Sequence, residues 1–264
     1  MHRRDFSSLL LGMGTAASAC LTGCSPATAA LPRVAERGPR AQIRGICFDL
    51  FTIFDPRSVT ALAHTIVKER SAELCEAWRL RQFQYAFLRT AANQYEDFRA
   101  VTVDALDYAA AAQGLTLSTS EREALVDAYS RLEPWPDTRV TLHAWKRAGL
   151  RLAPLANYSP RMLSGLLEHA QLSELFDVQI STDAARTFKP DPRAYALGPT
   201  RLGLPREQIV FAAFGGWDAA GARWFGYPTF WVNRLGVPAE KLGPGPDASG
   251  PTLSELAAFV SGWA

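Results

Sequence analysis

The first informative segment of the chain reads Cys47-Phe48-Asp49-Leu50-Phe51-Thr52-Ile53-Phe54-Asp55. It continues an apolar run that begins at Ile43, is interrupted at Arg44-Gly45 and ends at Asp49. Short apolar runs of this kind are typical of strands that are buried on both faces of a parallel sheet. The segment therefore predicts a first strand over residues 43–48, with an aspartate at its carboxyl end.

Downstream of this strand, the spacing of apolar residues changes to that of helices. Between about Ser58 and Trp135 apolar residues such as Leu62 and Ile66 recur at helical spacing, and no strand is recognisable. After Pro136 helical segments alternate with apolar runs, which cover residues 150–155, 178–180, 209–214 and 229–232. Such alternation is typical of a parallel sheet with crossover helices.

These patterns predict an α/β protein with a parallel-sheet core and an inserted helical cap. The core would consist of residues 42–57 and 136–264, and the cap of residues 58–135. With 264 residues, of which 48% are hydrophobic and 20% are charged, the chain is long enough for a core and such an insertion. A formal net charge of +2 and the lack of a basic stretch interleaved with aromatics argue against a nucleic-acid partner.

The first 24 residues are typical of an export signal. Arg3-Arg4-Asp5-Phe6 resembles a twin-arginine signal, and an apolar stretch too short to span a bilayer follows it. Leu21-Thr22-Gly23-Cys24 resembles a bacterial lipobox, in which the cysteine is acylated. We therefore expect a periplasmic protein that is anchored to a membrane by lipid on Cys24, with residues 25–41 as a tether. The alternative is a simple secretory peptide that is cut after Ala29 or Ala30.

The cysteines do not form a recognisable disulfide framework. Four cysteines are too few and too scattered for one in a chain of this size. Cys20 and Cys24 fall in the signal, whereas Cys47 and Cys75 fall at positions where cysteine is usually a small core residue. The sequence leaves a disulfide between Cys47 and Cys75 open, although nothing in the pattern supports it.

Polar residues follow the predicted strands at the edge where open parallel sheets bind ligands. They are Asp49, Asn157, Lys189 in the following loop, and Asp218. A lone aspartate at a strand end is more often a turn or helix-capping residue than a catalytic one. Four such residues, each of a type that suits nucleophilic displacement, instead favour a shared active site.

Several motifs together resemble those of the L-2-haloacid dehalogenases of the haloacid dehalogenase superfamily. They are the segment 47–55, Trp78-Arg79-Leu80-Arg81-Gln82, Phe188-Lys189-Pro190-Asp191-Pro192-Arg193-Ala194-Tyr195, Trp217-Asp218-Ala219-Ala220-Gly221-Ala222 and Trp231-Val232-Asn233-Arg234. Their order and spacing match from Arg44 to Arg234, which is more specific than any one motif. The resemblance implies a Rossmann-like parallel sheet with an inserted helical cap.

The resemblance also implies a reaction, the hydrolytic removal of halide from a small halogenated carboxylic acid. Asp49 would attack C2 and form an ester, which water activated near Asp218 would hydrolyse to a 2-hydroxy acid. Lys189 would keep both carboxylates ionised, and Arg79 would receive the halide. Substrate-binding positions of the family match Phe51, Thr52, Asn157, Tyr195 and Trp217. The resemblance implies no cofactor and no metal, and it suggests a homodimer.

Two positions argue against the phosphatases of the same superfamily. Those enzymes place acids two positions after the nucleophile and four positions before the final aspartate. Here the two positions are Phe51 and Phe214. Without carboxylates there, a hard divalent cation lacks oxygen ligands, and phosphoryl transfer is disfavoured.

The chain also departs from the family pattern around the substrate. The family's glycine between Phe51 and Thr52 is missing. Four other residues of the family pattern are replaced here: a serine is replaced by Ala156, a glycine by Tyr158, a second serine by Ala213 and an asparagine by Gly215. Each lost polar contact to a charged substrate costs roughly 1.5–3 kcal/mol. The sequence therefore leaves three interpretations: a divergent dehalogenase or related hydrolase, a catalytically silent lipoprotein that binds a small acid or a protein, and, least favoured, a phosphatase.

The N-terminal motifs predict the fate of the mature protein. Substituting Cys24→Ser removes the acylated thiol, so it should release soluble protein from the membrane fraction, because two or more acyl chains are what give stable attachment. Mass spectrometry of the mature N-terminus measures the modification directly. An unmodified chain that starts at Ala30 or Leu31 would contradict the lipid anchor while leaving export intact.

Overall fold

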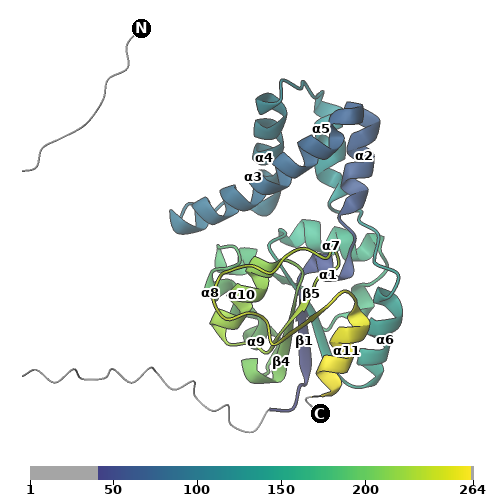
Figure 1. Cartoon of the computed structure of the whole chain (residues 1–264), viewed down its shortest axis with the longest axis vertical. Helices are drawn as coiled ribbons and strands as arrows, with labels where there is room; N and C mark the ends of the chain where they lie inside the picture. The colour runs from purple at the N-terminus through teal and green to yellow at the C-terminus, as the bar shows by residue number, and fades with distance from the viewer. Residues whose placement is uncertain (1–40, 263–264) are drawn as a thin grey trace, which may run out of the picture. The chain divides into compact units, whose positions relative to one another are not determined.

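A six-stranded parallel sheet forms the centre of the protein (Figure 1). The structure, a computed structural model, describes residues 41–262. Neighbouring strands are all parallel and follow the order β3-β2-β1-β4-β5-β6. The strands are β1 Gly45–Phe48, β2 Arg151–Ala156, β3 Ile180–Ser181, β4 Ile209–Ala213, β5 Thr229–Val232 and β6 Ala248–Gly250. The predicted α/β class is thereby confirmed.

Strand β1 lies in the middle of the sheet and is buried on both faces, as its apolar sequence predicts. Ile46 and Phe48 belong to the hydrophobic core on one face, and Cys47 belongs to the core on the other. Burial raises the pKa of the Cys47 thiol to about 12, so the thiol stays neutral. Cys47 and Cys75 are both free, and the disulfide that the sequence left open is not formed between them.

The prediction of strands was wrong in two places. The third strand was expected over 178–180 but covers Ile180–Ser181. Val178 is half-buried and Gln179 is exposed, so the chain enters the sheet only after them. Strand β6 was not predicted at all. Its sequence, Ala248-Ser249-Gly250, contains no apolar run, since an edge strand pairs with one neighbour only and stays partly open to solvent.

Helices cover both faces of the sheet (Figure 1). The helices that pack in the same hydrophobic core as Phe48 are α6 Thr138–Arg147, α7 Pro160–His169 and α11 Leu253–Ser261. Those that share the core of Cys47 are α8 Pro192–Tyr195, α9 Leu197–Leu202 and α10 Gly216–Phe225. Short 3₁₀ segments are η1 Lys68–Arg70, η2 Ser173–Leu175, η3 Thr182–Ala185 and η4 Arg206–Gln208.

Four further helices stand apart from the sheet, beyond the carboxyl end of β1 (Figure 1). They are α2 Arg57–Val67, α3 Ser71–Ala91, α4 Phe98–Ala112 and α5 Thr119–Ala128. Local signals set their starts: Asp97 caps α4 through its side chain, and Ser118 and Glu121 form a capping box on α5. We propose that this group is the cap, inserted between the core segments 42–57 and 136–264.

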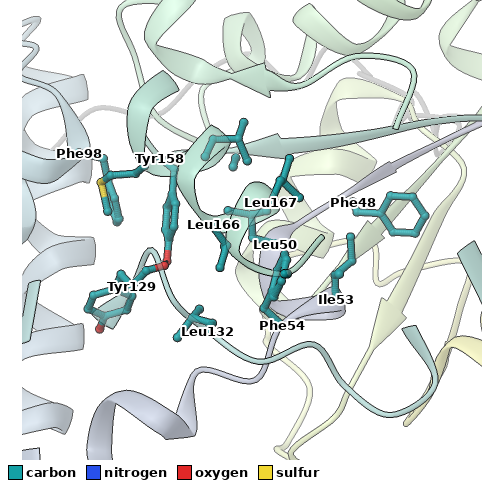
Figure 2. Close-up of a cluster of buried hydrophobic side chains, with 14 of the residues drawn as sticks. Phe48, Leu50, Ile53, Phe54, Phe98, Tyr129, Leu132, Tyr158, Leu166 and Leu167 are labelled. Carbon is teal, nitrogen blue, oxygen red and sulfur yellow. The ribbon is translucent and has the colours of Figure 1, made fainter. Parts of the chain in front are cut away.

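The segment after Asp49 is anchored in a hydrophobic cluster (Figure 2). Helix α1, Leu50–Ile53, begins directly at Asp49, and Leu50, Ile53 and the following Phe54 are at most 2% exposed. Leu166 of α7 lies in the same cluster. Because burial of these side chains stabilises the position of α1, it also fixes the backbone that presents Asp49.

The predicted signal (residues 1–24), its lipidation site Cys24 and all but the last residue of the predicted tether lie outside the described residues. Within residues 41–262, no helix combines the length and the apolar composition that a membrane crossing requires.

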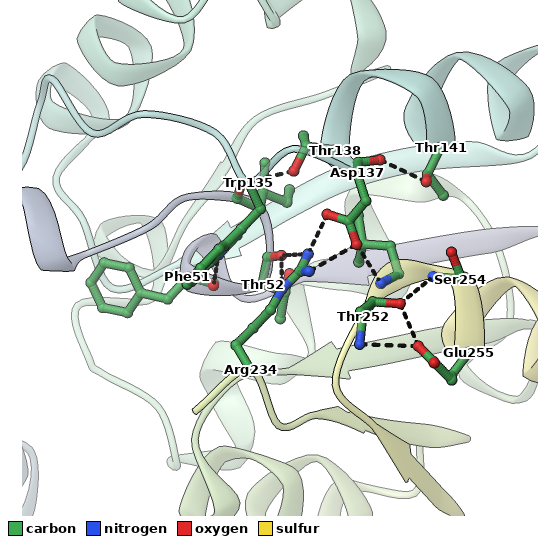
Figure 3. Close-up of polar contacts among 12 residues, drawn as sticks. Phe51, Thr52, Trp135, Asp137, Thr138, Thr141, Arg234, Thr252, Ser254 and Glu255 are labelled. Carbon is green, nitrogen blue, oxygen red and sulfur yellow. Dashed lines mark hydrogen bonds and ion pairs between the residues drawn. The ribbon is translucent and has the colours of Figure 1, made fainter. Parts of the chain in front are cut away.

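A buried ion pair joins the loop after β5 to α1 and to the start of α6 (Figure 3). Arg234 donates two hydrogen bonds to the carboxylate of Asp137, at 2.8 and 2.9 Å, and two to the carbonyl of Thr52, at 2.7 and 3.3 Å. Asp137 also accepts from the backbone N–H of Leu253 at 2.9 Å. The side chain of Arg234 is only 5% exposed. A single carboxylate therefore neutralises the guanidinium that holds the end of α1.

This ion pair predicts a large difference between two aspartate variants. Asp137→Ala leaves the buried charge of Arg234 unpaired, so it should lower the free energy of unfolding by about 3–5 kcal/mol. Asp107→Ala breaks an exposed pair with Arg122 and should change it by no more than about 1 kcal/mol. Urea denaturation measures both, and equal losses in the two variants would contradict the assignment.

Candidate active site

Asp49 stands where β1 ends and α1 begins. Its backbone N–H donates to the carbonyl of Ala212 in β4 at 2.9 Å, and its carboxylate accepts from the N–H of Phe51 at 3.1 Å. Thr52 Oγ1 donates to the Asp49 carbonyl at 2.7 Å. The carboxylate is thus fixed by the strand and the helix cap, while its side chain remains 16% exposed on a pocket.

The ammonium of Lys189 lies between two carboxylates. Its Nζ is 2.7 Å from Asp49 Oδ1 and 2.8 Å from Asp218 Oδ2, and the side chain is 1% exposed. Its backbone N–H donates to Asn157 Oδ1 at 2.9 Å, which ties the lysine loop to the end of β2. Burial by itself would lower the pKa of Lys189, but Asp218 and Asp49 outweigh it and hold that pKa above its usual range. The lysine is therefore a permanent positive charge in the site.

Asp218 lies in the first turn of α10 and is fully buried. Burial raises the pKa of its carboxyl group to about 6; the ammonium of Lys189 opposes this shift, and the charge of Asp49 adds to it. The hydroxyl of Tyr195 donates to Asp218 Oδ1 at 2.6 Å and favours the ionised form. A carboxylate with such a pKa can take a proton from water near neutral pH.

A pocket of about 450 Å³ opens between the strand ends and the cap helices. Asp49 and Asn157 line it from the sheet, Phe51 and Trp217 form parts of its wall, and Arg79 lines it from α3. The structure therefore brings five of the residues named from the sequence to one cavity, with Lys189 and Asp218 buried directly behind Asp49.

Two polar side chains of the pocket wall are available to a ligand. Arg57 and Arg234 are each paired with an aspartate, whereas Arg79 makes no ion pair among residues 41–262. Because Asn157 Oδ1 accepts from Lys189, its Nδ2 is a donor, and it makes no hydrogen bond within the described part of the chain. A guanidinium and an amide donor in the pocket that Asp49 also lines are suited to bind anionic groups.

Thr52 and Tyr195 do not line this pocket, and the role that the resemblance implied for them, to position substrate or nucleophile, stays a prediction. Both residues are fully buried. Thr52 holds the backbone of Asp49, and Tyr195 holds the carboxylate of Asp218. Through these contacts the two side chains position the carboxylates of Asp49 and Asp218.

The aromatic residues on the cap side of the pocket wall were not predicted from the sequence. Phe83 of α3 contacts Trp217 with ring centroids 5.3 Å apart, and Phe98 of α4 stacks on Tyr158 at 5.7 Å. Helical spacing shows which face of a helix is apolar but not which loop of the core it meets. Tyr158 was the one visible signal, because it replaces a glycine of the family pattern next to Asn157.

Aromatic rings occupy the two positions where the phosphatases have acids. Phe51 and Phe214 pack edge to face, with ring centroids 5.7 Å apart. Among residues 41–262, no group of three or more His, Cys, Asp or Glu side chains is arranged to hold a metal ion. These two positions therefore contribute apolar surface to the pocket instead of oxygen ligands.

A capped α/β sheet with an aspartate–lysine–aspartate centre at its carboxyl edge defines the class of this protein. Residues 32–226 match the family model described as haloacid dehalogenase-like hydrolase. An (S)-2-haloacid dehalogenase from Pseudomonas sp. (strain YL) is 41% identical over 206 residues, which are 78% of this chain and 89% of the relative. The chain belongs to the haloacid dehalogenase-like hydrolases.

Solved structures agree with this membership. A crystal structure of an L-2-haloacid dehalogenase matches with a TM-score of 0.82 and 40% identity, and the match covers 84% of this chain and all of the other. The L-2-haloacid dehalogenase from Xanthobacter autotrophicus with chloropropionic acid covalently bound matches with a TM-score of 0.79 and 32% identity, over 84% of this chain and 100% of the other. The resemblance that the motifs indicated is confirmed.

The hydrogen bond from Tyr195 predicts a shift in the pKa of Asp218. In Tyr195→Phe the carboxylate loses a donor, so its pKa should rise above the value of about 6 in the unchanged protein. Titration of the Asp218 carboxyl carbon by ¹³C NMR measures it. In the control Tyr227→Phe, the lost hydroxyl donates to the Tyr195 carbonyl, and the pKa should not change. An equal or lower pKa in Tyr195→Phe would refute the contact.

Proposed function

We propose that the protein hydrolyses a 2-haloacid to a 2-hydroxy acid through an ester on Asp49. The observation that supports this most strongly is the contact of Lys189 Nζ with both Asp49, at 2.7 Å, and Asp218, at 2.8 Å. One cation between two carboxylates lets one act as nucleophile and the other as base in successive steps. The name of the Pseudomonas relative, (S)-2-haloacid dehalogenase, supports the same substrate class.

In the first step, a carboxylate oxygen of Asp49 attacks C2 of the substrate from the side opposite the halogen. The O–C2 bond forms, the C2–halogen bond breaks, and halide leaves with the bonding electrons, so the configuration at C2 is inverted. The contacts with Phe51 and Lys189 hold the nucleophile in place for this attack. Arg79, the pocket guanidinium without an ion pair among the described residues, neutralises the departing halide.

In the second step, water attacks the ester carbonyl carbon of Asp49 rather than C2. Asp218 accepts a proton from this water, and its pKa of about 6 leaves the required carboxylate as the main form at pH 7. The bond between the carbonyl carbon of Asp49 and the oxygen attached to C2 then breaks. The product alkoxide takes the proton of the new Asp49 carboxyl group, which gives the 2-hydroxy acid and restores the Asp49 carboxylate, and the proton on Asp218 leaves to solvent.

The carboxylate of the substrate is held by Asn157. Ala156 lacks the hydroxyl of the family pattern, and its methyl group lines the pocket instead. The Nδ2 donor of Asn157 remains beside Asp49 and has no partner in the described part of the chain. Since the nucleophile, the lysine and the base also keep their mutual contacts, an active enzyme is favoured over a silent binding protein.

We also propose that the protein is exported, acts at a periplasmic membrane face through lipid on Cys24 and forms a homodimer. The motifs within residues 1–24 support the first two points, and these residues lie outside the described part of the chain. The dimer is supported by the family resemblance alone.

The nucleophile assignment predicts the effect of one isosteric change. Asp49→Asn retains an acceptor for Phe51 but cannot form the ester, so halide release should fall by at least about 10⁴-fold without loss of folded structure. Halide release and circular dichroism measure the two effects. Asp104→Asn, an exposed aspartate of α4, serves as the matched control. Halide release by Asp49→Asn at the parent rate would contradict the assignment.

The aromatic pair Phe51 and Phe214 predicts independence from divalent cations. Halide release should be the same before and after incubation with excess EDTA, because rings stand where a metal-binding site would need carboxylates. Ion-selective measurement of halide tests this. If chelation abolished turnover and magnesium restored it, the protein would instead resemble the metal-dependent phosphatases of the superfamily.

A further inference from the structure

Beyond Asp49, several aromatic rings form part of the pocket wall. The rings that line it belong to Phe51, Phe83, Phe98, Tyr129, Tyr158, Phe214 and Trp217. Four of these rings form a continuous row of contacts. The ring centroids are 5.7 Å apart for Phe214 and Phe51, 6.3 Å for Phe51 and Tyr158, and 5.7 Å for Tyr158 and Phe98. A ligand therefore meets ring faces and edges that continue from the core to the cap.

The polar atoms of Tyr158, Tyr129 and Gln82 in this wall form hydrogen bonds within the protein. The hydroxyl of Tyr158 donates to the Tyr129 carbonyl at 3.2 Å, and the hydroxyl of Tyr129 donates to Gln82 Oε1 at 3.2 Å. Gln82 Nε2 in turn donates to Thr102 Oγ1 at 3.0 Å. Hydroxyl or charged substituents on a ligand would lose water here without finding these groups free.

Gly215 allows the aromatic wall to extend to the cap. A Cβ atom at this position would lie 2.7 Å from Nε1 of Trp217, so a residue with a side chain would displace the indole. With glycine at position 215, the Trp217 ring contacts Phe83 and Phe87 of α3 edge to face. Its centroid is 5.3 Å from that of Phe83 and 5.4 Å from that of Phe87. The replacement of the family's asparagine by glycine thus exchanges a polar group for a ring.

The pocket is larger than a short haloacid requires. Its volume is about 450 Å³. A haloacid of three carbons has about six non-hydrogen atoms, which displace at most roughly 180 Å³ if each replaces one water of ~30 Å³. More than half of the pocket would remain for a substituent on C2.

We propose that the substrate is a 2-haloacid that carries an aromatic ring on the C2 side chain. The proposal rests on the proposed dehalogenation and names its substrate class. The carboxylate and halogen lie at Asn157 and Arg79, and the ring lies among Phe83, Tyr158 and Trp217. Burial of a ring against these side chains combines apolar burial with edge-to-face contacts.

The test compares (S)-2-chloro-3-phenylpropanoate with (S)-2-chloropropanoate on the full chain. In both acids C2 is not benzylic, so the intrinsic reactivity of the carbon–chlorine bond is similar. We expect kcat/KM to be at least about tenfold higher for the phenyl acid, mainly through a lower KM. Equal or lower kcat/KM for the phenyl acid would overturn the substrate class while dehalogenation stands. No halide from either acid would refute the proposed function itself.

A pair of variants on one helix tests the wall directly. Phe83→Ala should lower the ratio of the two kcat/KM values at least about fivefold, because it removes a ring from the wall. Leu88→Ala, on the same helix but 64% exposed and away from the pocket, should leave the ratio unchanged. If Phe83→Ala does not fold, Gly215→Ala, which displaces Trp217, replaces it in the comparison. A ratio that does not change in the wall variant would overturn the proposal.

Discussion

The buried ammonium of Lys189 is the charge on which the rest of the site depends. Asp49 lies at the junction of β1 and α1, and Asp218 lies in α10, yet both contact the same Nζ. Without that cation, the fully buried Asp218 would face the charge of Asp49 alone, which adds to the rise that burial causes in the pKa of Asp218. Asn157, at the end of β2, holds the lysine loop in turn. The parallel sheet makes this possible because its strands all end at one edge.

Much of the fold could be predicted because strands that are buried on both faces need continuous apolar runs. Strand β5 was predicted with its observed bounds, and β1 and β4 with small differences at their ends. The edge strand β6 escaped prediction because an edge position does not require such a run. Because the central strands could be recognised in the sequence, the polar residues that follow them could be named as candidates for the site. Lys189 indeed contacts both Asp49 and Asp218.

Side-chain roles that depend on contacts between distant segments could not be predicted from the sequence. Arg234 and Asp137 are 97 positions apart, and nothing in their local spacing connects them. Thr52 matched a substrate-binding position, but α1 begins directly at Asp49, and the Thr52 hydroxyl binds the Asp49 carbonyl. The loop that lacks the family's glycine therefore still ends in a tight helical turn. The aromatic wall likewise depends on how cap helices meet core loops, as in the stacking of Phe98 on Tyr158.

The central claim is that Asp49 forms an ester and that water attacks its carbonyl carbon. A single turnover in H₂¹⁸O, with enzyme in excess over the haloacid, tests this most directly. The account predicts that ¹⁸O appears in the side chain of Asp49 when the peptide is analysed by mass spectrometry, and that the hydroxyl of the first product molecule carries unlabelled oxygen. Label in the product hydroxyl and none in Asp49 would show that water attacks C2 directly, which would contradict the account.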